Sequence, residues 1–235
     1  MKQNILLIVF VCLSACQMDK NRGNNYLPIA GTAIDLGLTV KWSNCNLGAT
    51  RQEEYGDYFA WGETAPYYSS LPSNNWSIKW KKGKKSGYDW PSYKWCDDNE
   101  GHLTKYNNYS ELGNVDHKIA LEPQDDAAHA TLGGKWRIPT VKEWTELINR
   151  CSWENVIEND VSGCKVTGPN GNSIFLPFAG MCSGWISGDG NGFYWASHLD
   201  KRYERAAYML HVSSKDVKIE TFHRCNGISI RPVTD

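Results

Sequence analysis

The sequence predicts an α+β fold in which two helices precede a twisted antiparallel β-sheet. Two helix signatures lie between residues 125 and 151, and segments with strand character follow at short spacing from residue 161 onward. Helices followed by a run of strands are typical of α+β domains with antiparallel pairing. No linker-like break follows Gly31. We therefore expect a single domain over residues 31–235.

An alternating segment opens this domain. Ile34, Leu36, Leu38, Val40 and Trp42 alternate with polar residues or glycine. This is the period of a half-buried strand, so we expect a strand over residues 34–42.

The region from residue 55 to residue 109 is rich in Trp, Tyr and turn residues and has no helical period. Disordered chains are poor in aromatic residues. We therefore expect ordered loops and short strands held by aromatic packing. Four aromatic residues of this region are expected to serve structure rather than binding: Tyr58, Phe59, Trp61 and Trp95.

Two helices are predicted next. Asp125 or Asp126 can cap the first, and Gly133-Gly134 ends it. Thr140 begins the second, and Glu143 three residues later completes a capping box, which satisfies two backbone N–H groups. The apolar positions of the second helix keep helical spacing: Val141, Trp144, Leu147, Ile148 and Cys151.

Strands are predicted for the rest of the chain. Asn170-Gly171 is a hairpin turn signal inside the first connection. The expected strands are Val161–Thr167, Ser173–Phe178, Phe193–His198, Ala206–Val212, Val217–Phe222 and Ile228–Val233.

The first residues have the pattern of an export signal. Lys2 precedes an apolar run from Ile5 to Leu13, which is shorter than the ~20 residues of a membrane-spanning helix. Ser14-Ala15-Cys16 follows and resembles a lipobox. We expect residues 1–15 to be a lipoprotein signal peptide, Cys16 to carry the lipid, and residues 16–30 to be a tether, so that only the lipid contacts the membrane. An ordinary secretory signal with a chance cysteine is the alternative.

Six cysteines remain after Cys12 and Cys16. An exported protein can form disulfides, so we expect a disulfide-stabilised domain. Six cysteines allow 15 pairings, and the sequence does not choose among them. The candidates are Cys45, Cys96, Cys151, Cys164, Cys182 and Cys225.

The formal net charge is −1, which argues against nucleic acid as a partner, because nucleic-acid binding needs a strong positive field. The lysine-rich loop at residues 79–85 surrounds Trp80 with basic residues. This composition is typical of a solvated loop, and the sequence does not say whether the loop has a partner.

Eight strings between residues 44 and 233 occur in the order of a known family. They are Asn44–Ala49, Glu54–Thr64, Tyr93–Cys96, Asp125–Ala128, Gly134–Thr140, Gly171–Pro177, Tyr194–Ser197 and Gly227–Val233. Together they resemble the Fibrobacter succinogenes major paralogous domain, which occurs in exported lipoproteins of the Bacteroidetes type. The resemblance implies a C-type-lectin-like fold with its chain ends close together, related to the formylglycine-generating-enzyme scaffold through Arg137-x-Pro139-Thr140-x-x-Glu143. Bacterial members of the family are typically exported or surface proteins of unknown ligand, and some relatives use the scaffold to display variable binding loops.

Motifs for metal binding or catalysis are weak. Glu122-Pro123-Gln124 resembles a calcium-binding tripeptide of lectins but precedes the first predicted helix, where the lectin site does not lie. Cys225 is near the last predicted strand, as the formylglycine-generating cysteines are, but no second cysteine is five residues away. The six histidines are scattered, and Asp116-His117 favours a surface pair. We therefore expect no catalytic residue, no metal and no cofactor.

The sequence thus favours recognition of a glycan or a protein through the late loops, residues 182–192, 200–205 and 220–226. Binding residues often lie on loops of a rigid sheet. The candidate ligand-binding residues are Trp185, Tyr203 and Arg224. A formylglycine-generating type of enzyme and a structural adhesin component are the alternatives. The expected location is the cell envelope, as an outer-membrane lipoprotein, with surface exposure, leaflet, ligand and oligomeric state left open.

Overall fold

The computed structural model describes residues 31–66, 68–69, 79–80, 88–97, 101–183, 186–188 and 190–235. The predicted signal peptide, the predicted lipidation site Cys16, the predicted tether and Trp185 lie outside these residues. Most of the lysine-rich loop at 79–85 does as well. Among the described residues, no helix has the length and apolar character that crossing a membrane would require.

The α+β class is confirmed. The described residues contain helices α1 (Ala127–Leu132) and α2 (Val141–Arg150), three short 3-10 helices (Trp90–Ser92, Ser110–Leu112 and Pro123–Asp125), and small sheets with antiparallel pairing. The strands are β1 (Ala33–Ile34), β2 (Lys41–Ser43), β3 (Asp57–Tyr58), β4 (Tyr68–Ser69), β5 (Lys79–Trp80), β6 (Ser152–Glu158), β7 (Val161–Thr167), β8 (Ser173–Pro177), β9 (Met181–Cys182), β10 (Ile186–Ser187), β11 (Asn191–Leu199), β12 (Ala206–Ser213), β13 (Val217–His223) and β14 (Val233–Thr234).

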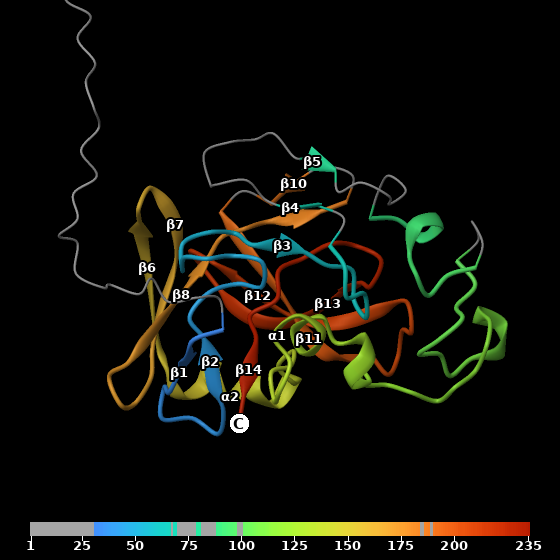
Figure 1. Cartoon of the computed structure of the whole chain (residues 1–235), viewed down its shortest axis with the longest axis horizontal. Helices are drawn as coiled ribbons and strands as arrows, with labels where there is room; N and C mark the ends of the chain where they lie inside the picture. The colour runs from blue at the N-terminus through green and yellow to red at the C-terminus, as the bar shows by residue number, and fades with distance from the viewer. Residues whose placement is uncertain are drawn as a thin grey trace, which may run out of the picture.

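The two ends of the described domain meet in one sheet. Strand β2 lies between β1 and β14, and its Trp42 pairs with Ile34 on one side and Val233 on the other. Figure 1 shows this sheet in front of α2, with the β6–β7–β8 sheet to its left and β11–β12–β13 behind it. The first and last strands of the described domain therefore flank the same strand.

The expected strand over residues 34–42 is wrong. The chain reverses there, so that β1 and β2 form a hairpin instead of one strand. Asp35 accepts a hydrogen bond from the Gly37 backbone N–H at 2.7 Å, and Gly37 has a φ of +73°, which favours glycine. The alternating side chains Leu36, Val40 and Trp42 are nevertheless buried. The alternating pattern therefore predicted which side chains are buried, whereas the turn at Asp35 and Gly37 determined the path of the backbone.

Both predicted helices are confirmed. The Asp126 side chain caps α1 by accepting from the backbone N–H groups of Ala128 and His129, and Gly133 ends the helix. Thr140 and Glu143 form the predicted capping box of α2. Trp144 of α2 is fully buried, and its Nε1 donates to the Trp195 carbonyl at 3.2 Å.

Strand β11 is buried on both faces of the sheet β11–β12–β13. Successive residues of β11 enter different cores: Tyr194 and Ala196 join the core under α2, and Phe193 and Trp195 join a second core around Trp61. Side chains alternate across a strand, so one strand can contribute to both cores. The predicted strands at 193–198, 206–212 and 217–222 correspond to these three strands.

Two predictions about the remaining strands need correction. Strand β6 was not expected, and it pairs with β7 through a turn at Asn159 and Asp160, which have φ values of 48° and 66°. Asn and Asp tolerate these left-handed conformations, so the Asn-Asp dipeptide was the missed hairpin signal. The strand expected over residues 228–233 is reduced to β14, because residues 228 and 229 form isolated bridges with Phe59 and Tyr194.

No disulfide bond joins any two of the six described cysteines, so the expected disulfide framework is not supported. Cys45, Cys164, Cys182 and Cys225 are buried, and Cys96 and Cys151 are half-buried. Unpaired cysteines are among the most buried residue types and pack as small apolar side chains. An even number of cysteines in a sequence with a predicted export signal therefore did not require pairing.

Candidate functional site

Tyr203 lies on the surface, as the late-loop prediction requires. Its side chain is 47% exposed, and its ring meets the edge of the His223 ring at a centroid distance of 5.9 Å. His223 in turn meets Trp90 at 6.1 Å. We call Tyr203, His223 and Trp90 the aromatic row. Trp90 comes from a 3-10 helix far away in the sequence and was not predicted to join the late loops.

Arg224 is not a surface anchor. Its side chain is fully buried, and its guanidinium donates hydrogen bonds to the carbonyls of Tyr106 at 2.8 Å and Lys105 at 3.0 Å. It also lies 5.5 Å from the centre of the Tyr93 ring. Burial lowers the pKa of the guanidinium, with Tyr93 among the groups that oppose this shift. Arg224 therefore serves the core, and its fully buried side chain is not available as the surface anchor that we expected.

Cys225, which carries the enzyme alternative, is buried to 4% exposure beside Tyr93 and Tyr58 in one core cluster. Burial raises the pKa of its thiol to about 12. A thiol is nucleophilic as the thiolate, so this environment does not activate Cys225. His223 faces the aromatic rings of Tyr203 and Trp90.

The Glu122-Pro123-Gln124 string belongs to a network of ion pairs. Glu122 contacts the ammonium groups of Lys105 and Lys118, and Lys105 also bonds Asp125 at 2.5 Å. The hydrogen bonds from Lys105 and Lys118 lower the pKa of Glu122 to about 2. Its carboxylate oxygens thus face lysines. No group of three or more candidate metal ligands occurs in the part of the chain that the structure describes.

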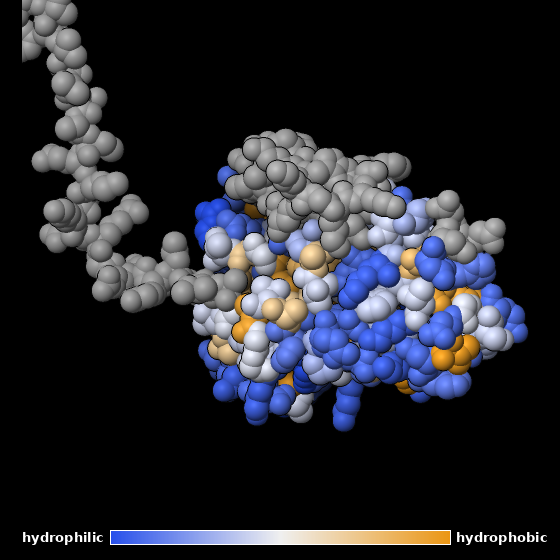
Figure 2. All heavy atoms as spheres, turned by 45° about the vertical axis from the view of Figure 1, so that its right-hand side comes forward, coloured by the Kyte–Doolittle hydropathy of each residue, from blue (hydrophilic) through white to orange (hydrophobic). Residues whose placement is uncertain are grey.

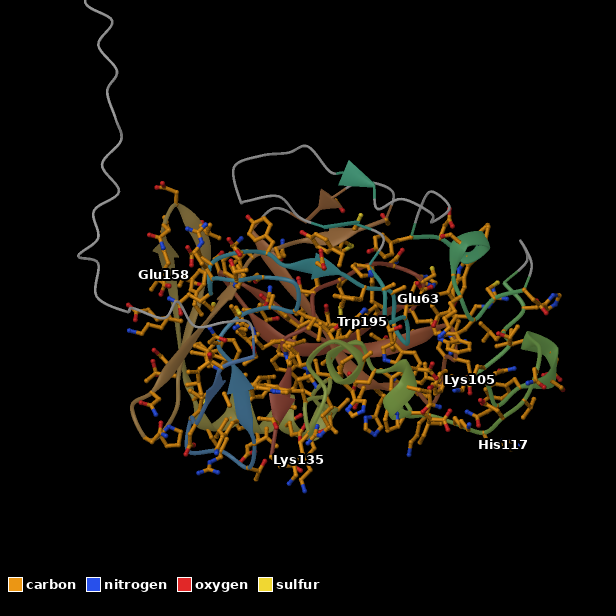
Figure 3. The ribbon with its side chains drawn as sticks, in the orientation of Figure 1. Glu63, Lys105, His117, Lys135, Glu158 and Trp195 are labelled. Carbon is orange, nitrogen blue, oxygen red and sulfur yellow. The ribbon has the colours of Figure 1, made fainter. Side chains whose placement is uncertain are left out.

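The side chains of Asp116 and His117 contact different partners. The Asp116 carboxylate accepts from the backbone N–H groups of Tyr106, Asn107 and Lys118. His117 has a φ of 56°, and its Nδ1 lies 3.4 Å from Asn108. Figure 3 shows His117 and Lys105 on the right of the molecule and Glu158 on the left, with Trp195 between them.

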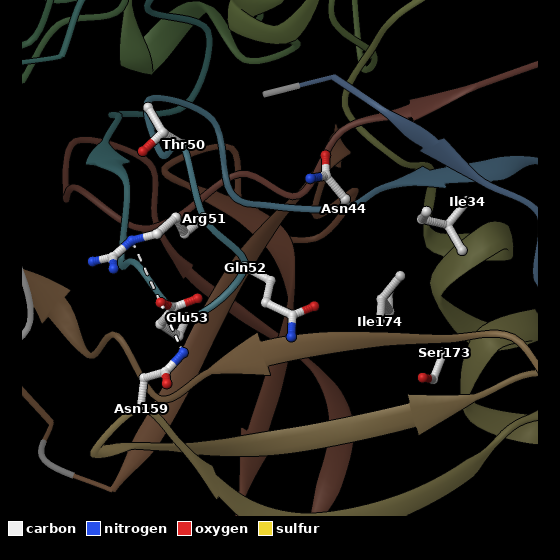
Figure 4. A pocket seen from close by; sticks show the side chains of 9 residues that line it. All are labelled: Ile34, Asn44, Thr50, Arg51, Gln52, Glu53, Asn159, Ser173 and Ile174. Carbon is white, nitrogen blue, oxygen red and sulfur yellow. Dashed lines mark hydrogen bonds and ion pairs between the residues drawn. The ribbon is translucent and has the colours of Figure 1, made fainter. Parts of the chain in front are cut away.

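A pocket with buried polar groups lies on the Glu158 side, between the β2–β3 loop and the β6–β7–β8 sheet. Its volume is about 460 Å³, within the range of roughly 300–1,000 Å³ that is usual for small-molecule sites. Figure 4 shows the side chains that line it: Ile34, Asn44, Thr50, Arg51, Gln52, Glu53, Asn159, Ser173 and Ile174. We refer to it as the Asn44 pocket.

Arg231 connects the two walls of the Asn44 pocket. Its guanidinium is fully buried and donates to the carbonyl of Ser43 at 3.1 Å, next to Asn44, and to the carbonyl of Phe175 at 2.7 Å, next to Ile174. It also donates to the side chain of Asn46 at 3.0 Å. These bonds span the loop after β2 and strand β8, so they fix the distance between the walls.

Glu54 orders the loop that carries Thr50 to Glu53. Its Oε2 accepts from the Thr50 backbone N–H at 2.8 Å and the Thr50 hydroxyl at 3.0 Å, and its Oε1 accepts from Arg51 Nε at 3.1 Å. Partial burial opposes ionisation of Glu54, but the hydrogen bonds from Thr50 and Arg51 outweigh it and lower its pKa. The loop is therefore held by a charged side chain outside the pocket lining.

Glu53 is the buried charge of the Asn44 pocket, with 5% exposure. Its Oε1 accepts a hydrogen bond from Asn159 Nδ2 at 3.1 Å and lies 3.4 Å from Arg51 Nε. A buried charge is costly unless it is paired and hydrogen-bonded, and Arg51 and Asn159 supply both interactions. A carboxylate can accept further hydrogen bonds beyond these two.

Asn44 is 7% exposed, and its side-chain oxygen is held by two hydrogen bonds. Its Oδ1 accepts from the Thr32 backbone N–H at 3.1 Å and from the Cys45 thiol at 3.5 Å. Its Nδ2 is buried and has no hydrogen-bond partner in the part of the chain that the structure describes. A buried donor without a partner costs about 1–3 kcal/mol and calls for an explanation.

Two other hollows are larger, but their described lining residues include no buried polar side chain that lacks a hydrogen-bond partner. One, of about 690 Å³, lies at the start of α2 and is lined by Ile119, Val141, Leu199 and neighbours, with exposed Lys142 and Lys201. The other, of about 560 Å³, lies on the outer face of β12 and β13. We therefore select the Asn44 pocket as the candidate site.

Comparisons with protein-family models, with curated proteins and with solved structures found no match to this chain. The site must therefore be interpreted from its own residues. Sequence reasoning did not find it, because its lining comes from β1, the β2–β3 loop, the β6–β7 turn and the start of β8. Asn159-Asp160 was the one local signal that pointed to this region.

Proposed function

We propose that this chain is a recognition protein, anchored by a lipid at Cys16, whose domain binds a glycan in the Asn44 pocket without transforming it. The observation that carries the proposal is that two buried polar side chains, Glu53 and Asn44, line the same pocket. Glu53 offers acceptor oxygens, and Asn44 offers a donor without a partner. Sugars present donors and acceptors together, so such a pair suits them.

The architecture agrees with the C-type-lectin-like fold that the family resemblance implies. Two helices precede β11–β12–β13, and the chain ends pair through β2. Neither feature is unique to that fold, and a fold does not determine a function. The family assignment therefore remains part of the proposal.

The polar surface is consistent with a ligand that enters a pocket. Figure 2 shows a mainly hydrophilic face on which hydrophobic residues are scattered in small groups. Large contiguous apolar patches often mark protein–protein interaction sites. On this face, a small polar ligand is favoured over a broad protein interface.

The test is a glycan array probed with the chain and with two charge variants. Glu53→Gln keeps the side-chain shape and removes the charge, and Glu154→Gln makes the same change at an exposed position of β6, outside the pocket lining. We expect binding by the native chain and by Glu154→Gln, in the presence of EDTA, and loss of at least about tenfold (~1.4 kcal/mol) in Glu53→Gln. Equal binding by Glu53→Gln and Glu154→Gln would contradict the assignment to the pocket.

The aromatic row is the second candidate surface. The His223 ring makes T-shaped contacts with the rings of Tyr203 and Trp90. The Arg205 guanidinium lies 5.5 Å from the centre of the Trp90 ring. Tyrosine and tryptophan give large contact area at low entropic cost. Tyr203→Ala on the same array tests whether the late loops contribute. A loss there without a loss in Glu53→Gln would move the site to this surface.

The lipid anchor has its own test. Replacing Cys16 with Ser should prevent incorporation of a labelled fatty acid and shift the protein out of the detergent phase. Incorporation that persists in Cys16→Ser would contradict the lipobox interpretation.

A further inference from the structure

We propose that the Asn44 pocket recognises the acetamido group of a 2-acetamido sugar; this inference rests on the proposed glycan binding and names the ligand class. An acetamido group contains one hydrogen-bond acceptor, one donor and one methyl group. The pocket contains a counterpart for each of them.

The acceptor of the ligand would meet Asn44. Because Asn44 Oδ1 already accepts from Thr32 and Cys45, the nitrogen of this side chain is the atom left without a partner. An N–H group requires an acceptor, such as a carbonyl oxygen. A ligand that supplies one removes the cost of the buried, unpaired donor.

The donor of the ligand would meet Glu53. Asn159 and Arg51 both contact Oε1 of this carboxylate. A carboxylate accepts only, so the matching ligand atom must carry a hydrogen, as an amide N–H does. Asn159 and Arg51 also keep the carboxylate in place before a ligand arrives.

The methyl group would meet the isoleucines. Ile34 is partly buried and Ile174 is 2% exposed, and both line the pocket. In Figure 4 the isoleucines lie on the right, Arg51 and Glu53 lie on the left, and Asn44 lies between them at the top. A flat amide has its C=O and N–H on opposite sides, so one acetamido group can reach Asn44 and Glu53 at once while its methyl group faces the isoleucines.

The charges around the pocket disfavour carboxylated sugars. Arg51 is shared between Glu53 and Glu54, and Gln52 bonds Glu158 at 2.5 Å. Two carboxylates therefore share one guanidinium, and a third carboxylate, that of Glu158, accepts a hydrogen bond from a side chain of the pocket lining. An anionic sugar would be repelled, whereas a neutral acetamido sugar carries no such cost.

The experiment compares two neutral oligosaccharides that share the same linkage. Tetra-N-acetylchitotetraose, called chitotetraose below, has an acetamido group on each ring, and cellotetraose has a hydroxyl at the same positions. Calorimetric titration of the full chain should give binding of chitotetraose at least about tenfold tighter (~1.4 kcal/mol) than binding of cellotetraose.

The matched variants are Asn44→Asp and Asn155→Asp. Aspartate at position 44 keeps the acceptor for Thr32 and replaces the donor by an acceptor, so it should abolish the preference for chitotetraose. Asn155 is exposed on β6 and does not line the pocket, so its variant should keep that preference. If Asn44→Asp does not fold, the comparison of the two sugars on the native chain still decides.

The outcomes separate this inference from the proposed function. Equal binding of both sugars, lost in Glu53→Gln, would overturn the acetamido inference and leave glycan binding intact. Failure of both sugars, with other glycans captured on the array, would also overturn the inference alone. Failure of every glycan on the array would overturn both.

Discussion

Arg231 donates a hydrogen bond from Nη2 to the carbonyl oxygen of Phe175 at 2.7 Å, which joins the segment after β13 to strand β8. The same guanidinium reaches Ser43 and Asn46, so all three of its nitrogens have acceptors. No carboxylate is among these partners. The charge is thus stabilised by carbonyl and amide oxygens, and burial lowers the pKa of Arg231. This arrangement holds the two walls of the Asn44 pocket at a fixed position relative to each other.

Replacing Arg231 with Lys should weaken folding and binding together. Lysine has one nitrogen and cannot reach the three acceptors, so buried carbonyls lose their partners. We expect a loss of about 3 kcal/mol in the free energy of unfolding, measured by urea denaturation. Arg150→Lys is the control, because Arg150 is 52% exposed and pairs with Glu146 on the surface of α2. That change should stay below about 0.5 kcal/mol. Equal effects of the two variants would contradict the bridging role.

Arg224 and Tyr203 should separate stability from surface binding. Arg224→Ala removes two donors from the carbonyls of Tyr106 and Lys105 in the core. It should cost about 3 kcal/mol. Tyr203→Ala changes an exposed ring and should alter the free energy of unfolding by less than about 1 kcal/mol. Thermal melts of both variants measure the contrast. A native-like melting temperature for Arg224→Ala would contradict its buried position.

The buried thiols should resist alkylation while the protein is folded. Burial raises the pKa of Cys225 to about 12 and that of Cys164 to about 11. At pH 8 almost no thiolate is present at either residue, and the thiolate is the reactive form. We expect iodoacetamide to leave both unmodified in the native protein and to modify both after unfolding in urea, as read by peptide mapping. Disulfide-linked peptides in the unreduced digest would instead restore the disulfide interpretation.

The parts of the fold that could be predicted are those with local causes. Helix α2 followed from the Thr140 and Glu143 capping box and from the spacing of Trp144 and Leu147, all within a few residues. The strand expected at 34–42 failed because periodicity reports which side chains are buried, while Asp35 and Gly37 determine where the chain turns. The Asp35-x-Gly37 sequence is itself a turn signal, so this reversal of the chain also has a local cause.

The candidate site could not be predicted, because its interactions are distant in sequence. Glu53 and Asn159 are 106 positions apart and still share a hydrogen bond. Arg224 shows the converse error. It stands between His223 and Cys225 in a polar segment that suggests a surface loop, but tertiary packing buries it against Tyr106. Burial of a charged residue depends on acceptors that come from elsewhere in the chain.

Acid should weaken the cap of α2 in a way that depends on Glu143. Arg137 donates to the Glu143 carboxylate through Nη1 at 2.8 Å and Nη2 at 2.5 Å, and the Thr140 backbone N–H donates at 2.7 Å. Burial opposes ionisation of Glu143, but the hydrogen bonds from Arg137 and Thr140 outweigh burial and lower its pKa below the ordinary value of 4.5. A carboxyl group whose pKa is lower in the folded state binds protons more readily in the unfolded state, so it stabilises the fold above the unfolded pKa.

This stabilisation should be complete at neutral pH and should disappear as the pH falls below about 4.5 and through the folded pKa of Glu143. Glu143→Gln removes the charge, so at pH 7 it should lower the free energy of unfolding by about 2 kcal/mol. The difference from the native chain should shrink as the pH falls from about 4.5 toward the folded pKa of Glu143, which lies below that value. Urea denaturation at pH 7, 4.5 and 3 measures this trend, with Glu154→Gln as the exposed control whose difference should stay near zero throughout. A difference for Glu143→Gln that does not change with pH would mean that shape, and not charge, holds this helix start.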